Sequence, residues 1–315
     1  MATAARSIED APPRATLAST GHVAQRALEG VIYGLLALCA TISVLTTIGI
    51  VVLLLVESSK FFAEVSPTEF LFGTRWSPLI RPQSFGILPL MCGTLLVTGG
   101  AIVVAAPLGL GTAIYLSEYA SPRVREVIKP LLEVLAGIPS VVYGVIAVTT
   151  VSPIVRWLFA SDSIFNALSA SLVVGLMILP TIVSLSEDVL RSVPRDLRSA
   201  AYALGATKFD VTAKVVVPAA ASGIVASMLL AVSRAVGETM AVTLAAGAMP
   251  KLTLNPLEAV QTMTAYIVQV SKGDTPSGSL EYHTIFAVGL ALFFSTMALN
   301  LLAQWVLSRV REQYE

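Results

Sequence analysis

The chain has 315 residues, of which 55% are hydrophobic and 13% are charged, whereas about a quarter are charged in an average globular domain. Twenty Lys and Arg balance twenty Asp and Glu, so the formal net charge is zero. A nucleic-acid-binding protein needs a basic excess and a disordered chain a large net charge, so both classes are excluded. The spacing of the charges indicates a protein of the lipid bilayer.

Six long segments of the chain contain no Asp, Glu, Lys or Arg. Each approaches or exceeds the roughly 20 apolar residues that a helix needs to cross about 30 Å of hydrocarbon. None alternates apolar and polar residues as the strands of a membrane barrel do. We therefore predict an all-α integral membrane protein with six transmembrane helices. The six segments are 30–56, 82–117, 134–155, 163–186, 215–233 and 282–308.

The two ends of the chain are predicted to face the cytoplasm. The first apolar segment has 27 residues, far more than the 7–15 or so of a signal-peptide core, so we expect a retained helix. With both ends inside, thirteen Lys and Arg lie in inner segments and six in outer ones. Basic residues favour the cytoplasmic side. We expect cytoplasmic tails at 1–27 and 309–315 and a transmembrane domain at 28–308.

The second apolar segment, 82–117, is too long for one straight helix across the bilayer. It contains Pro89 and Pro107, so we expect a kinked or re-entrant piece or an extension outside the membrane. The outer segment before it, 57–84, carries five Phe and Trp side chains. Aromatic residues are enriched at the membrane interface, and this segment fits a lid lying there.

The inner loop at 187–217 is the most charged part of the chain. Pro194 signals the start of a short helix, and Gly205 signals its end. A second short helix is expected from Lys208 until Pro218 ends it. The two helices would form a knob with small residues on its surface, which a partner could approach closely. A solvated connector is the alternative.

Arg234 and Glu238 stand alone inside the apolar region 215–250. Their i, i+4 spacing puts them on one helical face, where they can pair. A charged side chain at the bilayer centre costs about 2.5–3.5 kcal/mol, whereas an exposed i, i+4 pair contributes about 0.2–0.5 kcal/mol. Both groups should therefore face a polar pathway or the protein interior. A structural ion pair and a role in transport are both open.

Several catalytic motifs are missing from the sequence. The chain has no Gly-Lys dipeptide and hence no G-x-x-x-x-G-K-[ST] phosphate loop, so we do not expect it to hydrolyse ATP. Its two histidines, His22 and His283, lie outside any H-E-x-x-H motif, and no G-x-S-x-G occurs. An intramembrane enzyme is therefore disfavoured, and we expect no catalytic residue, no metal site and no cofactor of its own.

The inner loop resembles the signature of permeases in ATP-binding-cassette importers, which reads E-A-A, three residues, G, nine residues, I-x-L-P. Here 199–201, Gly205 and 215–218 fall at matching spacing, with Ser in the acidic position and Val in the Ile and Leu positions. The resemblance implies that this loop is a coupling helix docked on an ATPase. Its contact residues would be Ser199, Ala200, Ala201, Leu204, Gly205 and Ala206.

Other stretches resemble a narrower group, the PstC-type permeases of phosphate importers. Together they cover most of the chain from about Phe70 to Asn300. The sister PstA-type permeases share several of them, so that subunit, or a permease for another oxyanion, is an alternative. A secondary transporter is disfavoured by the inner-loop signature. The matching stretches are 85–90, 114–119, 135–144, 201–207, 234–241 and 273–276.

The resemblance implies a type I importer in the bacterial inner membrane. Such an importer would contain this chain, a PstA-like second permease, a homodimeric cytoplasmic ATPase that binds the ATP, and an extracytoplasmic phosphate-binding protein. ATP would close the ATPase and open the pathway outward, and hydrolysis would reset it. Arg234 would offer two parallel donors to phosphate, and Glu238 would hold Arg234 between substrates. In this setting a pathway role is favoured over a structural pair.

Overall fold

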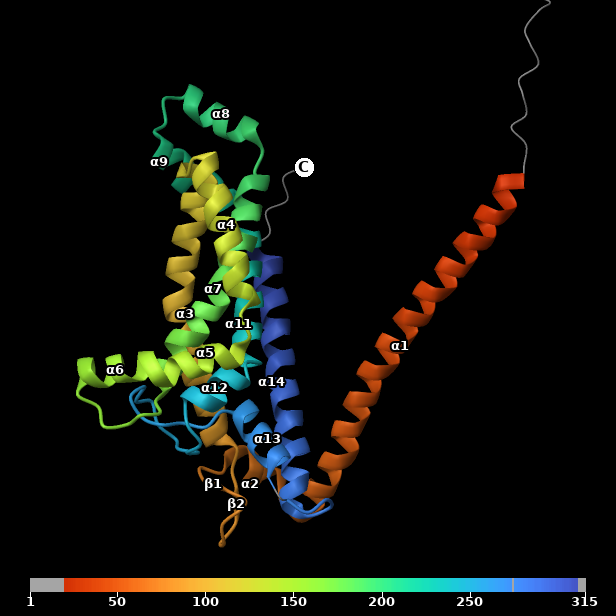
Figure 1. The fold of residues 1–315 in the computed structure, drawn as a ribbon, viewed down its shortest axis with the longest axis vertical. Helices are drawn as coiled ribbons and strands as arrows, with labels where there is room; N and C mark the ends of the chain where they lie inside the picture. Colours follow the sequence, from red (N-terminus) through yellow and green to blue (C-terminus); the bar gives the residue numbers. More distant parts are fainter. Residues whose placement is uncertain (1–19, 274, 311–315) are drawn as a thin grey trace, which may run out of the picture. The chain divides into compact units, whose positions relative to one another are not determined.

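The computed structural model describes residues 20–273 and 275–310, and these residues are almost entirely helical (Figure 1). The long helices are α1(Thr20–Glu64), α3(Leu88–Ile114), α4(Pro122–Gly137), α7(Ala167–Ser192), α11(Ala221–Val236) and α14(Leu280–Val310). The shorter ones are α2(Pro67–Phe72), α5(Ser140–Ile146), α6(Ser152–Phe159), α8(Arg195–Ala203), α9(Lys208–Val211), α10(Val217–Ala219), α12(Met240–Ala245) and α13(Met263–Lys272). Three π-helical turns, η1(Tyr115–Tyr119), η2(Ala147–Val151) and η3(Thr212–Val216), and two strands, β1(Trp76–Ser77) and β2(Ser84–Phe85), complete the elements.

The described residues contain five helices that are long and apolar enough to cross a membrane. A sixth span results if two helices that meet at a bend of 68° are counted as one broken span. The predicted all-α membrane fold is therefore confirmed, and each predicted segment overlaps one of these spans. The five helices are Leu28–Glu64, Leu88–Tyr119, Ser140–Phe159, Ala167–Ser192 and Leu280–Val306, and the bent pair is Lys208–Ala219 with Ala221–Val236.

The chain divides into two compact units, which meet within α1 after Leu53. The first unit contributes the stretch of α1 from Thr20 to Leu53, which is apolar from Leu28 onward and exposed along residues 28–50. The helix thus begins inside the segment predicted as a tail. Residues 1–19 and 311–315 of the predicted tails lie outside the described residues, and α14 runs on to Val310.

Two of the predicted spans differ in detail from expectation. The second begins at Leu88 rather than at 82, because residues 84–85 form a strand that pairs antiparallel with β1. The third is interrupted after α4, where Ile138 is extended (φ −67°, ψ 129°) before Pro139. Proline disfavours helical geometry in the residue before it. After the break, α5, η2 and α6 run across the direction of α3, α7 and α14 (Figure 1).

The first helix of the bent fifth span extends further along the chain than predicted. Pro218 does not terminate the helix, because the helical run that begins at Lys208 passes through the π-helical turn η3 and continues to Ala219. The bend falls at Ala220, which separates α10 from α11. The chain therefore enters the second half of this span two residues beyond the predicted stop.

Helices α3 and α7 form the centre of the second unit and approach each other closely through small residues. A Cβ on Gly109 would lie 2.7 Å from Cγ2 of Ile182, and one on Gly175 would lie 3.0 Å from the backbone oxygen of Ala101. Such contacts leave no room for a side chain and are typical of helix pairs in membranes. The buried side chains around this crossing form the largest apolar core of the unit.

A second core lies at the opposite end of the unit from α8, where α2, β1, β2 and α13 gather (Figure 1). Phe61, Phe70 and Trp76 are buried there, with edge-to-face contacts such as that between Trp76 and Tyr266, whose ring centroids lie 4.9 Å apart. These three side chains are enclosed rather than turned outward, and the position of the segment at a membrane interface stays a prediction. They pack against one another because the end of α1, the hairpin and α13 enclose them.

Candidate transport and coupling site

Arg234 lies in the last turn of α11 and is exposed. Its Nη1 donates a hydrogen bond to Oγ1 of Thr181 on α7 at 3.2 Å. Among the described residues, no carboxylate lies within ion-pair distance of its guanidinium. Since the guanidinium carries five N–H donors, most of them remain available for a ligand.

Glu238 does not pair with Arg234, and the predicted shared helical face is wrong. Helix α11 ends at Val236, and Gly237 and Glu238 lie in the break before α12. An i, i+4 relation holds only along a continuous helix. Instead, Oε1 of Glu238 accepts a hydrogen bond from the backbone N–H of Ala241 at 3.0 Å and so supports the first turn of α12.

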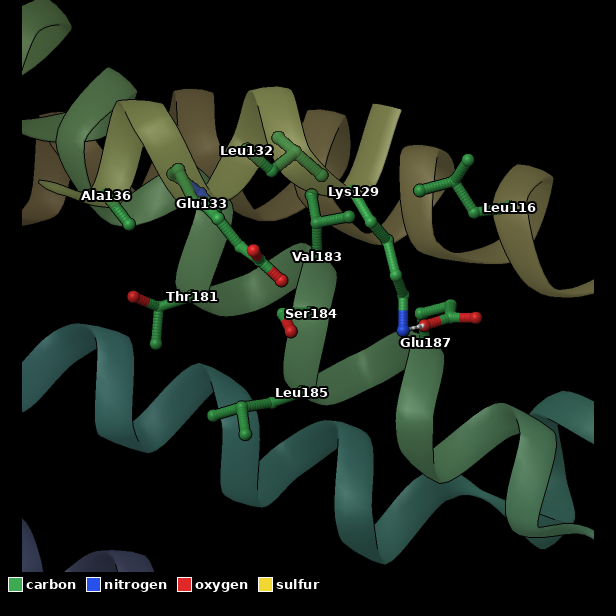
Figure 2. Close-up of a pocket in the computed structure, with 11 residues that line it drawn as sticks. Leu116, Lys129, Leu132, Glu133, Ala136, Thr181, Val183, Ser184, Leu185 and Glu187 are labelled. Atoms are coloured by element: carbon green, nitrogen blue, oxygen red, sulfur yellow. Dashed lines mark ion pairs between the residues drawn. The ribbon is translucent and has the colours of Figure 1, made fainter. Parts of the chain in front are cut away.

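A pocket of about 270 Å³ lies beside Thr181, between α4 and α7 (Figure 2). Figure 2 shows Glu133 of α4 reaching toward α7, where Ser184 lies. Thr181, Ser184 and Asp188 recur at helical spacing, so a polar strip follows α7 from Thr181, which Arg234 contacts, toward the C-terminal end of the helix. The lining consists of Leu116, Lys129, Leu132, Glu133, Ala136, Pro180, Thr181, Val183, Ser184, Leu185 and Glu187.

The inner end of this strip is a buried charge cluster around Glu187, whose side chain is 0% exposed. Nζ of Lys129 lies 2.5 Å from Oε2, while Nε of Arg125 and Nη1 of Arg191 each lie 3.5 Å from Oε1. The hydrogen bond to Glu187 raises the pKa of the Lys129 ammonium above its ordinary value. Sequence reasoning missed this cluster. The sequence does show cations in two separate predicted inner segments, Arg125 and Lys129 in one and Arg191 in the other. It does not show that the two segments lie side by side.

The short helix predicted in the inner loop is present as α8, and its C-terminal stop at Gly205 is confirmed. Gly205 has φ +83°, a left-handed conformation that glycine adopts without strain, and its N–H donates to the carbonyl of Tyr202 at 2.9 Å. Leu204 is 89% exposed, the highest value among the exposed large hydrophobic side chains. Figure 1 shows α8 and α9 beyond the ends of α3 and α7.

The six predicted coupling residues divide into two groups. Ser199, Ala200, Leu204 and Gly205 are exposed. Ala201 and Ala206 are partly buried and pack against the apolar core beneath α8. The first group is therefore accessible, whereas the second group seats α8 on the apolar core beneath it.

Comparison with known proteins identifies the family. A family model described as "Binding-protein-dependent transport system inner membrane component" matches residues 105–312. The probable ABC transporter permease protein YqgH of Bacillus subtilis (strain 168) is 36% identical over 273 residues, which cover 86% of this chain and 88% of that protein. The phosphate transport system permease protein PstC of Mesorhizobium japonicum is 31% identical over 322 residues, covering 96% and 97%.

Solved structures resemble the fold. A bacterial ABC transporter that imports the acidic polysaccharide alginate matches with a TM-score of 0.59 and 13% identity, over 82% of this chain and 89% of that one. The MetNI methionine ABC transporter, in an inward-facing conformation, matches with a TM-score of 0.54 and 16% identity, over 72% and 95%. The predicted fold of a type I importer permease is thereby confirmed. The chain belongs to the family of binding-protein-dependent transport system inner membrane components.

Proposed function

We propose that this chain is the permease subunit that moves inorganic phosphate into the cytoplasm as part of an ABC importer. Its family membership makes it an inner-membrane transport component rather than an enzyme. Phosphate as the cargo is supported by relatives named PstC, which are 28–31% identical over most of the chain. The observation that carries the proposal is the exposed guanidinium of Arg234, which lacks a carboxylate partner in the described chain.

The chemistry of Arg234 suits an oxyanion. A guanidinium is always charged and presents two parallel N–H donors that match two oxygens of phosphate. The contact with Thr181 engages Nη1 and orients the group while leaving other donors open. A charged ion in a low-dielectric region needs such a partner, because burying an isolated charge is expensive.

Glu238 remains part of the proposed pathway, in a role different from the one expected. It is partly buried, and its carboxylate is held at the first turn of α12 rather than at Arg234. A fixed negative charge near the pathway repels an anion that dwells there. Glu238 would thus keep the affinity of the site low enough for release.

The partners follow from the family and from α8. ABC importers of this family work with an ATPase and a substrate-binding protein, and the exposed surface of α8 is where we place the ATPase. A PstA-like second permease and a homodimeric ATPase complete the proposed complex. ATP would be bound by the ATPase, since this chain carries no phosphate loop. Nucleotide bound to the ATPase and the loaded binding protein on the opposite face would shift the balance between an outward-open and an inward-open pathway.

Replacing Arg234 by glutamine in the assembled importer tests the proposal. A charged, bidentate contact contributes about 1.5–3 kcal/mol, so phosphate uptake should fall by roughly 10- to 100-fold while the complex still co-purifies. The control is Arg75→Gln, since Arg75 is an exposed arginine outside the spans. Normal phosphate uptake by the Arg234→Gln complex would contradict the pathway role. Uptake of sulfate in preference to phosphate by the wild-type complex would contradict the cargo.

A further inference from the structure

Arg198 lies on α8 but turns away from the outward surface that Leu204 occupies. Its side chain is 21% exposed. Its Nη2 donates a hydrogen bond to the backbone oxygen of Leu190, in the last turns of α7, at 2.7 Å. The same atom lies 3.2 Å from Oε1 of Glu118, whose side chain is 6% exposed. Arg198 therefore connects α8 to α7 and to η1, the π-helical turn that ends the α3 span.

Arg125 of α4 continues the connection from η1. Its Nε donates to the backbone oxygen of Leu116 at 3.2 Å, and its Nη2 donates to that of Ser117 at 3.3 Å. The same guanidinium pairs with the buried Glu187 of α7 at 3.5 Å. Arg125 thus connects the π-helical turn to α7 as well.

These contacts connect α8 to α7 by two routes. The first is the direct hydrogen bond from Arg198 to Leu190, and the second passes through η1 and α4. Its order is Arg198, Glu118, η1, Arg125 and Glu187. Helix α7 also carries Thr181, six residues before Glu187, which corresponds to about 9 Å of helix rise. Thr181 in turn holds Arg234. A displacement of α8 therefore reaches the proposed substrate site through one uninterrupted helix.

The burial of the two carboxylates makes this chain of contacts resistant to rearrangement. Removing one partner from a buried ion pair leaves an uncompensated charge, which is strongly unfavourable. Glu118 keeps Arg198, and Glu187 keeps Arg125 and Lys129, only while α8, η1, α4 and α7 hold their present relation. The four elements are therefore expected to move as one body when α8 is pulled.

We propose that Arg198 and Glu118 are positioning residues that transmit the motion of a docked ATPase from α8 to the helix that holds Arg234. The proposal rests on the proposed function, because it takes α8 as the docking helix. Neither side chain touches Arg234. Both act through the backbone of α7 and the end of the α3 span.

The test uses the complete importer in proteoliposomes, with Arg198→Gln and Glu118→Gln as separate variants. Two quantities are measured, the phosphate taken up per ATP hydrolysed and the labelling rate of a Ser184→Cys reporter by a maleimide. Labelling is compared without nucleotide and with ATP plus vanadate, in a background where Cys39 and Cys92 are replaced by serine. The second quantity reports the motion of α7 whatever solute is carried.

The expected result is loss of coupling with the ATPase still bound. Both variants should hydrolyse ATP within about twofold of wild type, while uptake per ATP falls about tenfold and the nucleotide-dependent change in labelling disappears. The reciprocal exchange, Arg198→Glu with Glu118→Arg, should recover part of both quantities. The matched control is Arg123→Gln, because Arg123 lies in the same inner region, is exposed and makes no ion pair among the described residues.

Two outcomes would overturn the proposal. The first is a wild-type uptake ratio and a wild-type labelling change in both variants. The second is dissociation of the ATPase from Arg198→Gln while Glu118→Gln behaves as wild type, which would place Arg198 in the docking surface itself. If the wild-type complex carries no phosphate, the proposed cargo fails, but the labelling measurement still decides whether the linkage exists.

Discussion

Replacing Glu187 by glutamine removes one negative charge from a site where three cations converge. The side chain is 0% exposed, and its carboxylate lies within 2.5–3.5 Å of Lys129, Arg125 and Arg191. Glutamine keeps the shape of the side chain and can still accept a hydrogen bond, so the change isolates the charge. Without that charge, three cations face one another across a buried amide.

The size of the stability loss depends on how buried Glu187 is and on how exposed its three cations are. Breaking a buried ion pair by removing one partner costs about 3–5 kcal/mol. The three cations are partly exposed, between 21% and 51%, so they can recover some hydration from water. We therefore expect the free energy of unfolding to fall by about 3 kcal/mol, the lower end of that range.

The neighbouring Asp188 provides a matched control. It pairs with the same Lys129 at 3.2 Å, but its side chain is 61% exposed. A solvent-exposed ion pair contributes about 0–1 kcal/mol, so Asp188→Asn should lower the free energy of unfolding by no more than that. Both variants are unfolded in mixed micelles by titration with SDS, and their helical content is followed by circular dichroism.

The test compares the stability losses of Glu187→Gln and Asp188→Asn. If Glu187→Gln destabilises the protein no more than Asp188→Asn does, the buried cluster contributes no special stability. A loss confined to Glu187→Gln, reduced at high salt far less than the effect at Asp188, would support burial as the cause, because exposed charges are screened by ions.

Two further substitutions test the packing and a helix cap. A Cβ on Gly86 would lie 2.2 Å from the backbone of Gly73, so Gly86→Ala should lower the thermal midpoint and the free energy of unfolding by about 1–3 kcal/mol. Gly99→Ala, where a Cβ meets nothing within 4 Å inside α3, should leave both unchanged or slightly raised, because alanine favours a helix over glycine, and a loss equal to that of Gly86→Ala would refute the clash. The buried Oδ1 of Asn166 accepts a backbone N–H of the first turn of α7 at 2.7 Å, so Asn166→Ala should cost about 0.5–2 kcal/mol in the same SDS titration. As a control, Ser121→Ala removes a longer and exposed cap, at 3.5 Å, and should lower the free energy of unfolding by about 0.5 kcal/mol or less. A larger decrease for Ser121→Ala than for Asn166→Ala would refute the argument.

The local sequence determined the spans and the ends of several helices. A hydrocarbon core penalises each charged residue separately, so stretches without charge report the spans one segment at a time. The stop at Gly205 is equally local, because only the residue itself must adopt φ +83°. Pro139 likewise carries the local information that breaks the third segment, because the residue before a proline is pushed out of helical geometry.

The tertiary structure decided which charges meet between one helix and another. Arg234 and Glu238 are four residues apart, yet they separate because the chain leaves the helix at Gly237. Glu187 and Lys129 are 58 residues apart, yet they lie 2.5 Å from each other because α4 packs beside α7. Helical spacing describes neighbours only while the helix continues, and an ion pair between helices depends on how they pack. For that reason the sequence by itself determined which segments are long and apolar enough to cross a membrane, whereas the packing of α4, α7 and α8 decided how the charges of these helices are paired.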